Sequence, residues 1–99
     1  MSPLTAQADV PTAEASKYLR QPVRHFKHKI PASFDDHAST LDFPDGRTML
    51  KADNGLLKML VEAREEAGLK SLEDVLARHL ERFALREKPA IVWTEADPA

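Results

Sequence analysis

The sequence predicts an α+β domain, in which two helices pack on one face of an antiparallel sheet of four to five strands. Three observations lead to this prediction. Apolar residues recur at helical spacing in two separate segments, one in each half of the chain. Between these segments, apolar and polar residues alternate as they do in strands. The dipeptide Asn54-Gly55 lies between two such runs and favours a hairpin, and therefore antiparallel pairing.

Length and composition indicate one globular domain. The chain has 99 residues, of which 42% are hydrophobic and 30% are charged, and its formal net charge is −2. Chains divide into several domains only well above this length. The absence of cysteine excludes disulfides, thiolate metal sites and thiol nucleophiles. Neither a signal peptide nor an apolar run of about 18 residues occurs, so we expect a cytoplasmic protein with no membrane partner.

The first helix is predicted to follow a flexible lead-in over residues 1–11. Thr12 is a suitable N-cap, and Pro31 ends the helix. Pro22 lies inside it, where it removes one backbone hydrogen bond and is expected to kink the helix. The apolar face consists of residues at helical spacing, namely Ala15, Leu19, Val23, Phe26 and Ile30.

A meander of four short strands is predicted next, over residues 33–36, 40–43, 47–53 and 57–63. Pro44-Asp45-Gly46 marks the turn in its middle. Alternation places two sets of residues on one face of the sheet, namely Thr48, Leu50 and Ala52, and Leu57, Met59, Val61 and Ala63. Leu56 and Leu60 point to the other face and give it some apolar area, so the oligomeric state is open between monomer and homodimer.

The second helix is predicted to begin at Ser71, because Gly68 breaks the chain and Ser71 with Asp74 resembles a capping box. Its apolar face consists of Leu72, Val75, Leu76, Leu80 and Phe83. Pro89 stops it, and residues 90–93 are expected to form a short closing strand. The domain should therefore span residues 12–94, followed by an acidic tail over residues 95–99.

His79 falls near the centre of the apolar arc of the second helix. A buried imidazole needs hydrogen-bond partners for its ring nitrogens. One interpretation is a core histidine bonded to a carbonyl or a carboxylate, and the other is a histidine that faces a ligand or a metal. His25 and His28 lie three residues apart on the first helix, and His25 could approach His79 if the helices pack side by side. These three histidines are the candidate metal ligands, suited to zinc, copper or ferrous iron, although no fourth ligand is identifiable.

Arg78, Arg82 and Arg86 are spaced four residues apart and form one stripe beside His79. Like charges at this spacing destabilise a helix by about 0.2–0.5 kcal/mol per pair. Asp74 can pair with Arg78, whereas the other two arginines have no opposite charge at the matching offset within the helix. They either pair elsewhere in the protein or hold a carboxylate or phosphate ligand in a two-point contact. The protein partners we consider are Glu62, Asp42 and Glu87.

The candidate ligand-binding site therefore consists of His79, Arg82, Arg86, His25 and Tyr18. We expect a non-catalytic module that binds an anionic small molecule without a cofactor. No Ser-His-Asp arrangement and no glycine-rich phosphate loop can be assigned. The alternatives are a metalloprotein or enzyme that uses His25, His28 and His79, and a purely structural or protein-interaction domain.

A basic stripe follows the outer face of the first helix, and its members are Lys17, Arg20, Arg24 and Lys27. Such a stripe is usually a solvated face. The acidic net charge, and the lack of exposed aromatic residues interleaved with the stripe, argue against a nucleic-acid partner. Asp35-Asp36-His37 is expected to form a turn rather than a metal site.

Two motifs resemble the signatures of a prokaryotic family of unknown function, domain-of-unknown-function family 2218. Residues 15–21 with residues 25–29 resemble its N-terminal signature, and residues 79–87 with Trp93 resemble its C-terminal one. The turn at residues 43–46 also fits, whereas Pro22 replaces an expected leucine-like residue. The resemblance implies a fold similar to TATA-binding-protein-like or phosphohexomutase C-terminal domains, and no established activity. It also implies a reductase partner near iron uptake, because members look like appendages of siderophore-interacting flavoprotein reductases.

Overall fold

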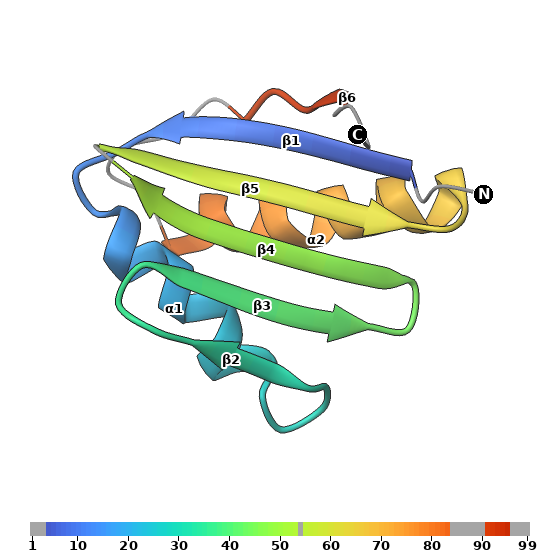
Figure 1. Cartoon of the computed structure of the whole chain (residues 1–99), viewed down its shortest axis with the longest axis horizontal. Helices are drawn as coiled ribbons and strands as arrows, with labels where there is room; N and C mark the ends of the chain where they lie inside the picture. The colour runs from blue at the N-terminus through green and yellow to red at the C-terminus, as the bar shows by residue number, and fades with distance from the viewer. Residues whose placement is uncertain (1–3, 54, 84–90, 96–99) are drawn as a thin grey trace.

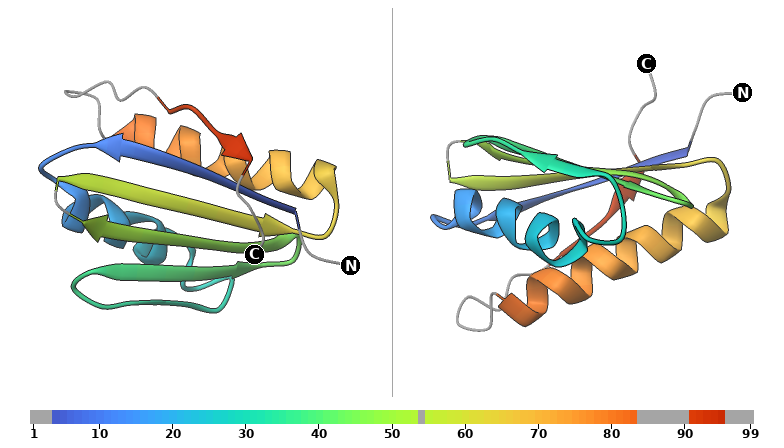
Figure 2. Two further views of the ribbon diagram at one scale, coloured as in Figure 1. Left: turned by 45° about the horizontal axis from the view of Figure 1, so that its top comes forward. Right: turned by 90° about the horizontal axis from the view of Figure 1, so that it is seen from below.

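The computed structural model describes residues 4–53, 55–83 and 91–95, which form an antiparallel sheet with both helices on one face (Figure 1; Figure 2). The elements in chain order are β1 (Leu4–Pro11), α1 (Ala15–Phe26), β2 (Ala32–Phe34), β3 (Ala38–Phe43), β4 (Gly46–Asp53), β5 (Leu56–Ala63), α2 (Glu66–Phe83) and β6 (Thr94–Glu95). The strand order is β2-β3-β4-β5-β1-β6, and each neighbouring pair is antiparallel. The predicted α+β class is confirmed, with a two-residue β6 as a sixth strand in the described part.

The core lies between the sheet and the two helices. Leu50 on β4 pairs with Met59 on β5, which pairs in turn with Ala8 on β1, and all three are buried. The face of the sheet predicted from alternation is therefore the face that the helices cover. The largest side chains with almost no exposure include Leu19, Leu41, Leu57, Met59, Leu72 and Leu76. Burying each such side chain favours folding by about 1.5–3 kcal/mol.

The prediction of a flexible lead-in is wrong for residues 4–11. They form β1, which pairs with β5 along its whole length, from Leu4 opposite Ala63 to Pro11 opposite Leu56. Ala6, Ala8 and Val10 alternate with more exposed residues and are buried under the helices. Alanine is only weakly hydrophobic, so the alternation of buried and exposed residues in this strand is hard to recognise from the sequence.

Helix α1 is shorter than predicted, because it begins at Ala15 and ends at Phe26. Thr12 does not cap it directly; its Oγ1 accepts a hydrogen bond of 3.0 Å from the N–H of Glu14, the residue before the helix. Pro22 lies inside the helix and is buried, and the helix continues through it. The proline therefore removes its own N–H without ending the helix.

Helix α2 begins at Glu66, so the predicted start at Ser71 is wrong. Gly68 lies within the helix, in its first turn. A Cβ on residue 68 would be 3.3 Å from both the backbone oxygen and the Cβ of Asp45. The glycine thus allows the helix to approach the β3–β4 turn closely, and it does not break the helix.

The closing strand is also displaced from its predicted position. Instead of residues 90–93, the paired residues are Thr94 and Glu95, and Thr94 lies opposite Gln7 of β1. The rest of the predicted acidic tail, residues 96–99, lies outside the described residues. Neither α1 nor α2, as far as the structure describes them, is long and apolar enough to cross a membrane.

Candidate functional site

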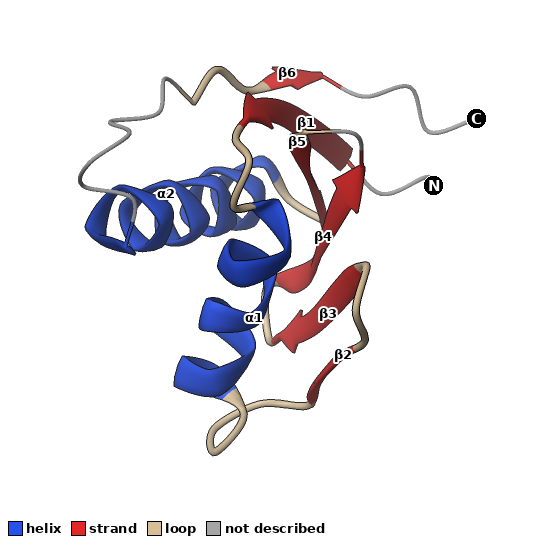
Figure 3. Cartoon of the chain, turned by 90° about the vertical axis from the view of Figure 1, so that its left-hand side faces the viewer, coloured by secondary structure: helices blue, strands red, loops and turns tan. Residues whose placement is uncertain are grey.

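Helices α1 and α2 lie on the same side of the sheet and contact each other (Figure 3). The ring centroids of His25 on α1 and His79 on α2 are 4.9 Å apart, with an angle of 58° between the ring planes. The ring of Phe26 lies 4.7 Å from that of His25 and 5.6 Å from that of His79. The structure therefore brings together two histidines from separate helices, as the sequence predicted. We call this place the α1–α2 seam and define it by Gln21, His25, Phe26, His79 and Arg82.

His79 is half-buried in the seam, and its pKa lies below the ordinary value for histidine. Burial is the largest cause, because it disfavours the charged ring. The neighbouring His25 and, to a smaller extent, Arg82 lower the pKa further, since each carries or can carry positive charge. A hydrogen bond with the backbone of Gln21 acts in the opposite direction. His79 thus has the carbonyl contact expected of a core histidine, although it lies next to cationic groups.

Tyr18 belongs to the core and lies near His79. Its side chain is buried, with 8% exposed. Both residues line a cavity of about 10 Å³, the size of a single water molecule. Tyr18 is therefore buried beside His79, and its contact with a ligand stays a prediction.

The arginines of the stripe differ in their surroundings. Arg78 pairs with Asp74 at 3.0 Å, as predicted. Arg82 is exposed, and it makes no ion pair with any carboxylate in residues 4–53, 55–83 and 91–95. The suggested pairing of Arg82 with Asp42 is wrong, because Asp42 lies on the other face of the sheet and pairs with Arg47 at 2.6 Å. The predicted contacts of Arg86 and Glu87 lie outside the described residues.

The three histidines do not form a set of three metal ligands. His28 is exposed, and the ring contacts found among the described residues do not include it. The described part of the chain contains no group of three or more histidine, aspartate or glutamate residues placed to hold a metal ion. Zinc sites usually have three or four protein ligands. The seam offers two imidazoles to such a site.

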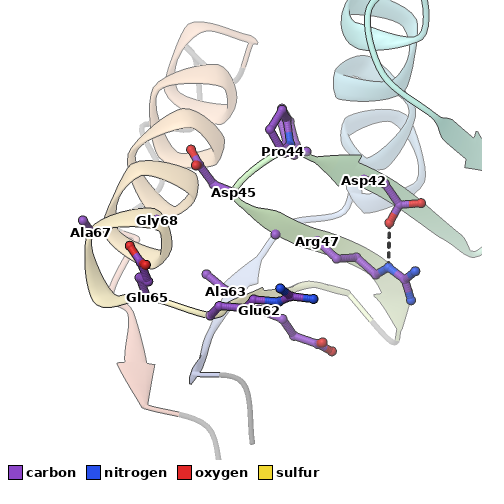
Figure 4. Close-up of a pocket in the computed structure, with 12 residues that line it drawn as sticks. Asp42, Pro44, Asp45, Arg47, Glu62, Ala63, Glu65, Ala67 and Gly68 are labelled. Carbon is purple, nitrogen blue, oxygen red and sulfur yellow. Dashed lines mark hydrogen bonds and ion pairs between the residues drawn. The ribbon is translucent and has the colours of Figure 1, made fainter. Parts of the chain in front are cut away.

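A surface groove lies elsewhere, between the β3–β4 turn and the start of α2 (Figure 4). Its volume is about 1000 Å³. Carboxylates and arginines alternate around it, namely Asp42, Asp45, Glu62 and Glu65 with Arg47 and Arg64. Apart from the turn signal at Pro44-Asp45-Gly46, no sequence pattern singles out this groove, because its residues come from strand ends and from the start of a helix. Its charges have both signs and partly neutralise one another.

The Asp35-Asp36-His37 segment forms a turn, as predicted. The carboxylate of Asp35 accepts hydrogen bonds from the backbone N–H groups of His37, at 2.7 Å, and Ala38, at 2.9 Å. These two bonds lower the pKa of Asp35, because they stabilise the carboxylate. The segment closes the loop between β2 and β3 and is not part of the seam.

Sequence patterns missed two residues of the seam. Gln21 contributes a backbone group, which no side-chain pattern can reveal. Phe26 was assigned to the apolar face of α1, and its ring does pack at 5.2 Å from Phe43 of the sheet. The same ring also contacts both histidines. The contact with His79 depends on how the two helices cross, which the sequence does not specify.

Comparisons with known proteins agree with the fold and with the motifs. A family model described as "Uncharacterized protein conserved in bacteria (DUF2218)" matches residues 7–94. The chain is also similar to the NMR structure of PA4090 from Pseudomonas aeruginosa, with a TM-score of 0.80 and 26% sequence identity over 92% of this chain and 95% of that chain. A comparison with curated proteins found no match. Because the family model covers the sheet and both helices, the chain belongs to the bacterial family of uncharacterized proteins that the sequence motifs indicated.

Proposed function

We propose that the protein is a non-catalytic module that binds an anionic ligand at the α1–α2 seam. The contacting groups are His25, His79 and Arg82. One observation carries the proposal: two imidazole rings lie 4.9 Å apart beside an arginine that has no ion pair within the described residues. Arg86, which follows Arg82 by four residues, is retained as a further proposed contact.

The electrostatics of the seam favour an anion over a cation. Both His25 and Arg82 lower the pKa of His79, which shows that adding a positive charge to the His79 ring is unfavourable in the seam. A bound carboxylate or phosphate would offset this repulsion. The guanidinium group of Arg82 and the exposed imidazole of His25 would supply charge-assisted hydrogen bonds, which are the strongest class in proteins, and the anion would lie beside the ring of His79. His25 and Arg82 are exposed, so a ligand can reach them directly from solvent.

A binding role fits these residues better than a catalytic one. A histidine that acts as a general base is usually oriented by a carboxylate. The groups that shift the pKa of His79 are His25, Arg82 and the backbone of Gln21, and none of these is a carboxylate. The seam therefore supplies hydrogen-bond donors and positive charge, which hold an anion without activating a nucleophile.

The proposed ligand class is a polycarboxylate, free or as its ferric complex. Such complexes are anionic, and their carboxylates match the two-point geometry of a guanidinium group. This ligand class agrees with the role near siderophore-mediated iron uptake that the family resemblance implies.

NMR titrations with citrate, ferric citrate and inorganic phosphate test the proposal. We expect saturable shifts of the His25 and His79 ring signals and of the Gln21 amide at millimolar ligand. Arg82→Gln should weaken binding about tenfold, because it removes a charge-assisted hydrogen bond of about 1.5 kcal/mol. Arg78→Gln is the matched control, since Arg78 lies one turn earlier on the same helix and pairs with Asp74. It should change the affinity less than about twofold.

Two outcomes would contradict the proposal. If none of the three probes shifts the seam signals at millimolar concentration, no anion binds there. If Arg78→Gln weakens binding as much as Arg82→Gln, the titration reports general charge rather than a site. A titration with Zn²⁺ separates the metal alternative, which predicts shifts of both rings with the metal and none with citrate.

A further inference from the structure

The basic stripe on α1 is unopposed within its own helix. Residues Ala15–Phe26 include no aspartate or glutamate. Lys17, Arg24 and Lys27 are exposed, and none of them makes an ion pair in the part of the chain that the structure describes. From residue 17 to residue 27 the helix rises about 15 Å. A row of positive charge therefore runs along almost the whole helix, with Arg20 beside the edge strand β2.

Part of this row lines a shallow depression of the surface. A shallow depression of about 350 Å³ is lined by Ala13, Glu14, Ser16, Lys17, Arg20, Gln21 and Arg24. The Nε atom of Arg20 is buried and has no hydrogen-bond partner within the described residues. Its terminal nitrogen pairs with Asp36 at 3.4 Å, a long ion pair with an exposed carboxylate. The depression thus presents three cationic side chains and one carboxylate, that of Glu14, and Asp36 holds the middle cation, Arg20.

An exposed aromatic ring lies beside the row. Phe34 on the edge strand β2 is 45% exposed, and the guanidinium carbon of Arg20 lies 6.0 Å from its ring centroid. Helix α1 and strand β2 are neighbours in the fold (Figure 3). The sequence argument against a nucleic-acid partner rested partly on the lack of such a ring. The structure supplies it from a different element.

We infer that this surface, which consists of Lys17, Arg20, Arg24, Lys27 and Phe34 and is here called the α1–β2 surface, binds single-stranded nucleic acid. The phosphodiester backbone follows the cationic row, and a base stacks on Phe34. Basic grooves with aromatic platforms are the general means by which proteins bind single strands.

The combination of features favours this partner over other polyanions. An acidic peptide would use the cationic row but would gain nothing specific from an aromatic ring. A duplex keeps its bases stacked inside, so none could reach Phe34. Asp36 pairs with Arg20, so the phosphates would contact the three cations of the row that make no ion pair within the described residues, namely Lys17, Arg24 and Lys27.

Fluorescence anisotropy with labelled oligo-dT and oligo-rU at low salt tests the inference. We expect saturable binding whose logarithm of affinity falls with the logarithm of salt concentration with a slope of about −2, as for about three phosphate contacts on a single strand. Lys17→Gln should weaken binding and reduce this slope by about 0.7, because it removes one phosphate contact. Phe34→Ala should weaken binding about tenfold without changing the slope, since stacking releases no counterions.

Three further variants serve as controls. Phe34→Leu keeps an apolar side chain on β2 but lacks a ring, so it should lose affinity as Phe34→Ala does while preserving packing. Lys51→Gln removes an exposed charge from the opposite face of the sheet and should leave affinity within about twofold. Arg82→Gln tests independence from the α1–α2 seam, and it should weaken citrate binding but not oligonucleotide binding.

Each of three results would overturn the inference. One is the absence of oligonucleotide binding at low salt. Another is equal affinity of the wild-type protein and both Phe34 variants. The last is equal binding of single strands, duplex DNA and polyglutamate, which would show a general polyanion surface.

Discussion

The two ends of helix α2 differ in how their charges are arranged. At its start, four carboxylates and two arginines line the large groove, and Asp42 and Arg47 pair at 2.6 Å. Near its other end, His25, His79 and Arg82 lie together, and the residues that the structure describes provide no carboxylate paired with Arg82. The larger opening thus has charges of both signs, which partly neutralise one another, whereas the charged groups of the seam are all basic. Unopposed charge, rather than groove size, is the better guide to a binding site here.

The two ends also differ in what a substitution should disturb. The groove is built on close backbone approaches at Gly46 and Gly68. The seam is built on side chains that are exposed or half-buried. Substitutions at the groove should therefore lower stability, whereas substitutions at the seam should change ionisation and ligand binding.

The largest expected effect is on stability at the groove. A Cβ on residue 46 would collide with the carbonyl oxygen of Glu62 on the neighbouring strand. Gly46→Ala should therefore lower the free energy of unfolding by about 3 kcal/mol, measured by urea denaturation. Gly55→Ala is the control, because Gly55 has open space around a Cβ and only a positive φ of 79° to accommodate. It should cost about 1 kcal/mol, and an equal loss for both would rule out the collision as the cause.

The next effect is a pH dependence that originates at the seam. The pKa of His79 is lower in the folded protein than the ordinary histidine value of about 6.5, so the unfolded chain binds more protons as the pH falls through 6.5. The contribution of His79 to stability is therefore present above that pH and is lost below it. The slope from one histidine is at most about 1.4 kcal/mol per pH unit.

Urea denaturation between pH 5 and 7.5 measures this dependence. His79→Gln should flatten the fall in stability at low pH, whereas the exposed His28→Gln should leave it unchanged. The same slope in wild type and His79→Gln would mean that another group causes the acid sensitivity.

A smaller effect distinguishes two arginines of α2 by their neighbours. Arg82 lowers the pKa of His79, so Arg82→Gln should raise it. Arg78 pairs with Asp74 and is not among the groups that shift His79, so Arg78→Gln should leave that pKa unchanged. NMR pH titration of the His79 ring measures both. A rise of equal size in the two variants would contradict the specific contact with Arg82.

The smallest expected effect is the loss of protein stability when the exposed Arg78–Asp74 ion pair is removed. Its partners are four residues apart on the helix and largely exposed. Removing it by Arg78→Gln should cost about 0.3–0.5 kcal/mol, and less at high salt. A loss several times larger in urea denaturation would show that Arg78 has a packing role that the ion pair does not explain.

Strong local patterns predicted much of the fold. The alternation in β4 and β5 gave the buried face: Leu50 is followed by Lys51 and Met59 is preceded by Lys58, and Leu50 and Met59 are buried opposite each other. Strand β1 was missed because its inward residues are mostly alanine. The start of α2 was predicted too late because Gly68 was expected to break the helix. The position requires glycine because Asp45, which is 23 residues away in sequence, approaches it closely. Tertiary packing overrode local preference at both places.

The site was partly predictable for the same reason. Helical spacing placed His79 on an inward face and His25 at the edge of another, and the two rings do meet. The orientation of Tyr18 into the core and the contact with the Gln21 backbone depend on how the helices cross, which spacing alone does not determine. Phe34 lies next to Arg20 only because β2 folds back beside α1.

The most direct test of an anion site at the seam is the pKa of His79 with and without citrate, measured by NMR at constant ionic strength. A carboxylate bound beside the ring stabilises its charged form, so saturating citrate should raise this pKa in the wild-type protein. The rise should be much smaller in Arg82→Gln at the same citrate concentration. An identical pKa of His79 in the presence and absence of citrate would contradict the account.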